Sequence, residues 1–151
     1  YASSYHYDRE GNPDFPAVLI TDTSKTQFLF RINKGLEDIH ESVNLHMPLE
    51  DRPIPFKNMI YIGDGLTDVP CMAVTRQGDG HAVAVYNPAS FKAKDICKKL
   101  FRDKRADFLA AADYTENSEL TFMMKKLIDL KLANLVVKDI FIKIEQDVNF
   151  T

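Results

Sequence analysis

Two carboxylates four residues apart, Asp64 and Asp68, follow a short apolar run and are the groups in this chain best suited to chemistry. Residues 58–72 read N-M-I-Y-I-G-D-G-L-T-D-V-P-C-M. The run 59–62 is β-branched and aromatic, which is typical of a strand buried on both faces. Pro70 is compatible with the first turn of a helix that follows the glycine-rich turn. Because ligands bind outside the carboxyl ends of strands in open α/β sheets, we expect Asp64 to project from a strand end, with Asp68 one turn later.

Two carboxylates held this close repel each other unless a proton or a cation lies between them. Hard oxygen ligands suit Mg²⁺, which binds one or two carboxylates together with waters and phosphate oxygens. In the simplest alternative, Asp64-Gly65 is a hairpin turn and Asp68 a helix cap. A hairpin would need a second alternating strand, and residues 66–74 lack that pattern. The spacing therefore favours a Mg²⁺ site formed by Asp64 and Asp68.

A helix is expected to begin at Lys25. Residues 24–27 read S-K-T-Q, a capping-box pattern. A lysine in the first turn faces the positive end of the helix dipole, which costs about 0.3–1 kcal/mol unless an anion offsets it. Helix amino termini bind phosphate, and a lysine adds a point charge for the same anion. Lys25 is thus a candidate phosphate ligand, with an ordinary solvated lysine as the alternative. One buried stripe is expected along the helix, formed by Phe28, Ile32, Leu36 and Ile39.

Residues 63–68, G-D-G-L-T-D, resemble the fourth motif of the haloacid dehalogenase superfamily, and most closely its phosphoserine-phosphatase-like branch. In that superfamily a strand ends in G-D-x-x-x-D and both acids bind Mg²⁺. The third motif is a lysine near the start of the preceding helix, which steadies the nucleophile and the phosphoryl group. The resemblance places Asp64 and Asp68 on the metal and makes Lys25 the catalytic and phosphate-binding lysine, ahead of Lys34, which lies over two turns further along. It covers about residues 1–129 and implies a three-layer Rossmann-like parallel sheet.

The nucleophile of the family is the first Asp of a D-x-D motif, and this sequence contains no D-x-D. Asp22 and Asp113 each follow a strand candidate, but neither has an acid two residues on. The chain begins at Tyr1 and resembles the interior of a longer sequence. We therefore expect the carboxyl-terminal part of a Mg²⁺-dependent phosphatase that forms an aspartyl-phosphate. Its nucleophile would lie in a missing amino-terminal part, its substrate would be a small phosphorylated molecule, and this chain alone would be inactive.

Two alternatives remain open at this point. The first is a non-catalytic metal- and phosphate-binding or regulatory domain derived from the same fold, which the missing D-x-D favours. The second is a halide-releasing enzyme of the same superfamily. It is the weaker alternative, because such members need no Mg²⁺ and tend to lack this acid spacing.

Bulk composition narrows the class of protein. A net charge of −3 and an isoelectric point near 5.8 disfavour a nucleic-acid binder. Cys71 and Cys97 form no C-x-x-C, so neither a zinc site nor a disulfide framework is expected, and a reducing cytoplasm is the simplest location. No apolar span of about 18 residues is present, so we expect no membrane insertion.

Three regions are expected along the chain. Residues 1–24 are extended segments with a turn at 8–13 and a strand at 17–21. Residues 25–129 form the core, in which strands at 82–86 and 108–112 alternate with a helix at 91–101. This alternation predicts a parallel sheet with helices on both faces, incomplete in this stretch.

The remaining segments flank or interrupt that core. Three prolines make the loop 44–57 irregular. A helical region opens at Ser118 and continues with breaks. Its terminal part, 130–151, is expected to pack in the core, with packing against missing sequence or against a second copy in a homo-oligomer as the alternatives.

Overall fold

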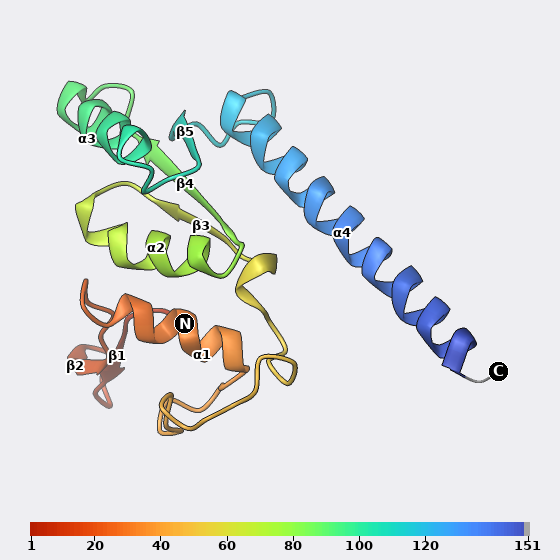
Figure 1. Ribbon diagram of the computed structural model, residues 1–151. Coiled ribbons are helices and arrows are strands. Elements are labelled where there is room, and N and C mark those ends of the chain that lie inside the picture. Colours follow the sequence, from red (N-terminus) through yellow and green to blue (C-terminus); the bar gives the residue numbers. More distant parts are fainter. Residues whose placement is uncertain (150–151) are drawn as a thin grey trace.

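The computed structural model describes residues 1–149. Phe150 and Thr151, the end of the expected terminal extension, lie outside the described residues. Figure 1 shows the course of the chain. In chain order the elements are β1 (Ser4–Tyr7), β2 (Pro13–Val18), α1 (Lys25–Lys34), β3 (Ile60–Gly63), α2 (Val69–Gln77), β4 (His81–Tyr86), α3 (Phe91–Arg102), β5 (Phe108–Ala111) and α4 (Glu119–Asn149), with 3₁₀ turns at Phe56–Asn58 and Leu66–Asp68.

Strands β3, β4 and β5 form a parallel sheet in that order. Ile60 pairs with His81 at one end of β3, and Gly63 pairs with Ala84 at the other. Each strand lies within about one residue of its predicted position, because a strand covered on both faces is a continuous apolar run bounded by turn residues. The predicted α/β class and parallel sheet are confirmed.

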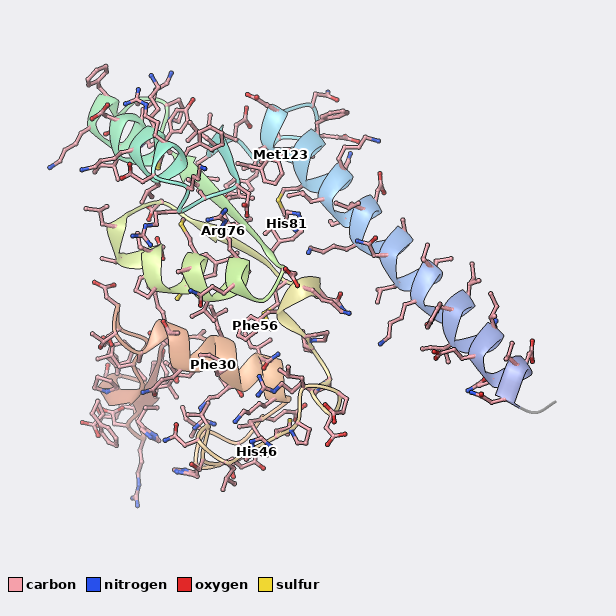
Figure 2. All side chains as sticks on the ribbon, viewed as in Figure 1. Phe30, His46, Phe56, Arg76, His81 and Met123 are labelled. Carbon is pink, nitrogen blue, oxygen red and sulfur yellow. The ribbon has the colours of Figure 1, made fainter. Side chains whose placement is uncertain are left out.

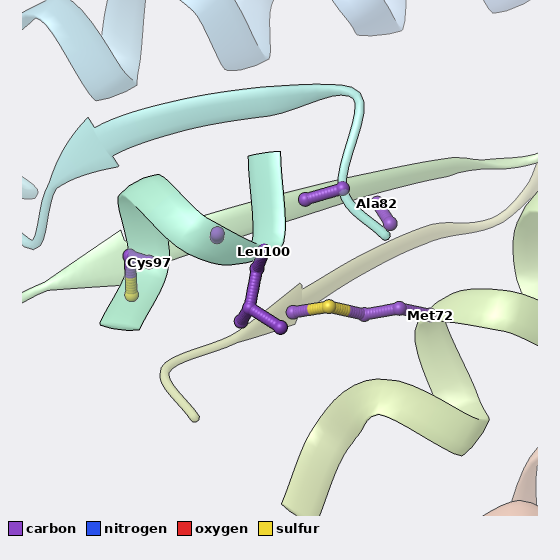
Figure 3. Packing of buried hydrophobic residues seen from close by; sticks show 6 residues of the cluster. Met72, Ala82, Cys97 and Leu100 are labelled. Carbon is purple, nitrogen blue, oxygen red and sulfur yellow. The ribbon is translucent and has the colours of Figure 1, made fainter. Parts of the chain in front are cut away.

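The sheet carries helices on both faces, as predicted. Successive side chains of β4 point to opposite sides, so Ala82 and Ala84 face α2 and α3 while Val83 and Val85 face α4. On the first face the core is closed by Met72, Cys97 and Leu100, as seen in Figure 3. On the second face it is closed by Leu120 and Leu127. The small alanines let α2 and α3 approach closely, and the fully buried Met72 fills the space between them.

Residues 1–24 form an antiparallel hairpin of their own beside α1 (Figure 1). The predicted turn is present, because the Asp8 carboxylate accepts hydrogen bonds from the backbone N–H groups of Glu10 and Asn12. The second strand lies at residues 13–18 rather than 17–21, because pairing with β1 rather than local apolarity decides its position.

Helix α1 begins at Lys25 as predicted, but two expectations about it are wrong. Ser24 makes no capping hydrogen bond, because its Oγ instead accepts one from the Thr21 N–H at 2.8 Å. The helix also ends at Lys34, where Gly35 takes a left-handed conformation (φ 68°), so the expected apolar stripe cannot continue along it.

The buried positions of α1 are polar. Arg31 donates to the carbonyl oxygens of Asp38, Ile39 and Glu41, while Ile32 and Ile39 of the expected stripe are exposed. The polar face of α1 therefore anchors the irregular loop that follows, in which the prediction of no regular helix or strand at residues 44–57 holds apart from the 3₁₀ turn.

Helix α4 is continuous, so the predicted breaks are wrong. Residues 119–149 contain neither glycine nor proline, and nothing interrupts the backbone hydrogen bonds. Leu120, Leu127 and Lys131 are buried against the sheet, whereas every residue from 132 to 149 is exposed, and this half projects beyond the sheet in Figure 1. The expected packing of residues 132–149 in the core is therefore wrong, and the alternative contact with a second copy or further sequence stays a prediction.

Among residues 1–149, no helix combines the length and apolarity that crossing a membrane would require.

Candidate functional site

The carboxyl ends of the three parallel strands open onto a pocket of about 380 Å³. Gly63 ends β3, Tyr86 ends β4 and Ala111 ends β5, so the residues that follow these strands meet at one edge of the sheet. The structure thus brings together all three side chains singled out in the sequence. The pocket is lined by Lys25, Ile62, Gly63, Asp64, Asp68, Val85, Asn87, Ala112 and Tyr114.

The turn after β3 depends on Gly63. A Cβ at this position would lie 2.6 Å from the Cβ of Asp68 and 2.8 Å from the Cε of Met72, closer than real side chains approach. With glycine there, the chain folds back through a 3₁₀ turn into α2, whose first turn holds Pro70 as predicted. The Asp68 carboxylate closes the turn, because its Oδ2 accepts from the N–H groups of Asp64 (3.0 Å) and Gly65 (3.2 Å).

The other oxygen of Asp68 holds the lysine. Its Oδ1 accepts from Lys25 Nζ at 3.0 Å and from the Tyr61 hydroxyl at 2.7 Å. The Asp68 side chain is only 6% exposed and the Lys25 side chain 29% exposed. Four donors therefore occupy the four acceptor positions of this carboxylate. In this conformation Asp68 fixes the position of Lys25 and of the turn at 63–65.

Each ionisable group in this cluster is held in one protonation state. Burial alone would raise the pKa of Asp68, but the hydrogen bonds from Tyr61, Lys25 and the Asp64 amide outweigh it, and its pKa lies below the usual range. The hydrogen bond to Asp68 raises the pKa of Lys25. Burial, followed by the hydrogen bond to Asp68, raises the pKa of Tyr61. At neutral pH the site therefore holds an ammonium, a carboxylate and an intact phenol.

The cation at the start of α1 is offset by carboxylates of the chain itself. Besides the hydrogen bond to Asp68, Lys25 Nζ lies 3.6 Å from Asp22 Oδ1 and 3.5 Å from Thr67 Oγ1. The contacts to Asp22 and Thr67 are long and partly exposed, so they are weak. Lys25 thus has one firm partner and N–H groups available to a ligand in the pocket.

Asp64 is the free carboxylate of the site. It is exposed, and its carboxylate oxygens accept no hydrogen bond from the described residues 1–149. A free hard oxygen ligand at a strand end can bind a divalent cation. Within the same part of the chain no group of three or more His, Cys, Asp or Glu residues could hold a metal ion. Binding of one ion by Asp64 and Asp68 together stays a prediction, since Asp68 would first have to release donors.

Sequence reasoning missed three residues of this site. Tyr61 is a polar-tipped residue in an otherwise aliphatic strand, and Asn87 and Tyr114 lie just beyond the ends of β4 and β5. Inspecting the residues that follow each parallel strand would have found Asn87. Lys34, the alternative to Lys25, donates instead to the carbonyl oxygens of Val43 and Leu45 in the loop, away from the pocket.

Comparison with known proteins leaves the function open. No family model matches the chain, and no solved structure matches it. An uncharacterized protein of Borreliella burgdorferi (strain B31) is 36% identical over 112 residues, which is 72% of this chain and 37% of that protein. The chain thus spans little more than a third of the length of this relative.

Proposed function

We propose that this chain is the carboxyl-terminal part of a Mg²⁺-dependent phosphate-monoester hydrolase with the Rossmann-like fold of the haloacid dehalogenase superfamily. The observation that carries the proposal is the convergence of Lys25, Asp64 and Asp68 on one pocket at the carboxyl edge of a parallel sheet. Lys25 at the start of a helix and Asp68, the last residue of the motif G-D-G-L-T-D, are 43 residues apart, yet their side chains meet.

Each residue has a distinct task in this proposal. Lys25 binds the phosphoryl oxygens of a small phosphorylated substrate, and Asp68 and Tyr61 keep its ammonium charged and oriented. Asp64 is the residue that would hold Mg²⁺, and its exposed carboxylate suits an ion that keeps several waters. Bound there, Mg²⁺ supplies charge neutralisation at the transferring phosphoryl group. The sequence holds no D-x-D, so the proposal assigns the nucleophile to another segment of the parent protein.

The test compares matched variants of the parent protein on p-nitrophenyl phosphate with and without Mg²⁺. Asp64→Asn and Lys25→Met should each lower kcat/KM by about 100-fold or more, as loss of a charge-stabilising group does. The controls Asp95→Asn and Lys92→Met remove the same charges from exposed positions of α3 and should leave turnover unchanged. Full activity in Asp64→Asn, with its Mg²⁺ dependence retained, would contradict the proposal.

A non-catalytic phosphate-binding or regulatory domain is the second candidate, because the nucleophile motif is absent. It predicts that the parent protein hydrolyses no phosphate monoester, while Mg²⁺ gives the 151-residue chain a site for inorganic phosphate in the pocket around Lys25. Asp64→Asn should abolish that binding. Hydrolysis by the parent protein excludes this alternative.

A further inference from the structure

A second cavity, of about 280 Å³, lies at the amino edge of the sheet, between the start of β4 and helix α4. Figure 2 shows His81, the first residue of β4, in the space between the sheet and α4. Lys131 of α4 reaches the same place, and its Nζ lies 2.6 Å from the carbonyl oxygen of Lys57 and 3.1 Å from His81 Nδ1. Only 9% of Lys131 is exposed.

Lys131 is a buried cation that no described carboxylate approaches within ion-pair distance. Burying an ammonium without an opposite charge is unfavourable, and burial lowers the pKa of Lys131 accordingly. Burial and then the charge of Lys131 lower the pKa of His81. Asp107 acts on His81 in the opposite direction, but its carboxylate is paired with Arg76 at 2.7 Å. An added anion would remove the imbalance at Lys131.

Lysines outnumber acidic residues in the lining of the cavity. A charged lysine has only N–H groups to offer, so His81 accepts through Nδ1 and carries its own proton on Nε2. Two of the three N–H groups of Lys131 are used, which leaves one for a ligand. Lys57, Lys138, Asn58 and Asn134 line the same cavity, and Asp79 is the acidic residue among its lining.

We propose that this cavity binds the phosphate group of a small anionic effector, through Lys131, Lys138, Lys57 and the Nε2–H of His81. Strand β4 separates the site from the candidate active site, and its six residues run for roughly 17 Å from His81 to Tyr86. The phosphate is therefore a second ligand and not the substrate of the pocket around Lys25. A larger adjoining hollow of about 770 Å³ accommodates the organic part of the effector, and it shares with the cavity the residues Lys57, Asn58, Asp79, Leu135 and Lys138.

The test follows the imidazole resonances of His81 by NMR during titration of the chain with inorganic phosphate. His81 is the histidine that lines this cavity, so its ring should shift in a saturable way while His6, His40 and His46 stay unchanged. Lys131→Met and Lys138→Met should each weaken the apparent affinity about tenfold or more, since each removes a charge-assisted hydrogen bond. Lys143→Met, also on α4 but outside the cavity, should bind phosphate like the unchanged chain.

Three results would overturn the proposal. The first is a His81 ring that does not respond to phosphate. The second is a response that Lys25→Met abolishes, which would place the bound phosphate at the other edge of the sheet. Lys138 is exposed, so Lys138→Met keeps the fold and decides the question even if Lys131→Met is unstable. An equal affinity in Lys138→Met and Lys143→Met also contradicts the assignment.

Discussion

Lys25 and Lys131 lie at opposite edges of one sheet, and their surroundings are opposite in kind. Lys25 is bound to a buried carboxylate 3.0 Å away, which raises its pKa. Lys131 is more deeply buried but has a carbonyl oxygen and a neutral imidazole as partners, and its pKa is lowered. Burial lowers the pKa of a lysine that has only neutral partners, and a hydrogen-bonded carboxylate reverses the direction of the shift at Lys25.

The sharpest test of this difference is the stability of two equivalent variants. Lys25→Met leaves Asp68 buried without its cation and should lower the free energy of unfolding by about 2–4 kcal/mol. Lys131→Met removes a buried charge that has no opposite charge and should change stability by less than about 1 kcal/mol, or raise it. Urea denaturation at pH 7 without phosphate measures both.

The double variant Lys25→Met/Asp68→Asn serves as the control for this comparison. The neutral amide that replaces the Asp68 carboxylate needs no cation. The double variant should therefore lose about 1 kcal/mol or more less free energy of unfolding than the sum of the losses in Lys25→Met and Asp68→Asn. If Lys25→Met and Lys131→Met lowered the free energy of unfolding equally, the proposed difference between a paired and an unpaired lysine would be contradicted.

A smaller loss of stability is expected when the Tyr61 hydroxyl, which donates to Asp68, is removed. Tyr61→Phe removes the 2.7 Å hydrogen bond to Asp68 and should lower stability by about 1–2 kcal/mol at pH 7. The Asp68 pKa is depressed in the fold, so its stabilisation is present above the ordinary value of 3.8 and is lost as pH falls through the folded pKa. Without Tyr61 that folded pKa rises, and the acid-unfolding midpoint should move to higher pH. Tyr86→Phe is the control, since the Tyr86 hydroxyl makes no hydrogen bond within residues 1–149.

The smallest effect is expected from His81 at mildly acidic pH. Its pKa is lowered from 6.5 in the fold, so the unfolded chain binds the proton more readily and stability should decrease as pH falls below 6.5. Phosphate in the cavity would favour the protonated imidazole and should reduce this decrease. Unfolding curves of the unchanged chain and of His81→Gln between pH 7 and 5, with and without phosphate, measure how much His81 contributes to the pH dependence of stability. A pH dependence that His81→Gln leaves unaltered would contradict it.

Sequence patterns predicted the carboxyl edge better than the amino edge for a physical reason. Asp64 and Asp68 lie in one strand–turn–helix unit, where local periodicity determines which side chains share a strand end. Lys25 was predicted from the helix start that S-K-T-Q indicates and from the lysine that the resemblance implies. His81 and Lys131 are 50 residues apart and lie on elements of different type, so no local spacing marks their contact.

Other expectations failed where tertiary partners override local rules. The Ser24 hydroxyl is taken by Thr21, which no capping pattern indicates. Arg31 and Asn33 are buried because their side chains bind carbonyl oxygens of a loop, whereas apolar periodicity would place leucines or isoleucines there. Metal binding by Asp68 stays a prediction, but local spacing does not indicate that Lys25, Tyr61 and two backbone N–H groups donate to its carboxylate.

Gly63 links stability and function in a way that limits how this chain can vary. A single methyl group there would press on Asp68, which orients Lys25, and on Met72, which fills the core. Any side chain at residue 63 therefore disturbs both the site around Lys25 and the core around Met72. A mutational scan should therefore find residue 63 intolerant even in a selection for folding alone, so tolerance data at this site cannot separate a loss of activity from a loss of fold.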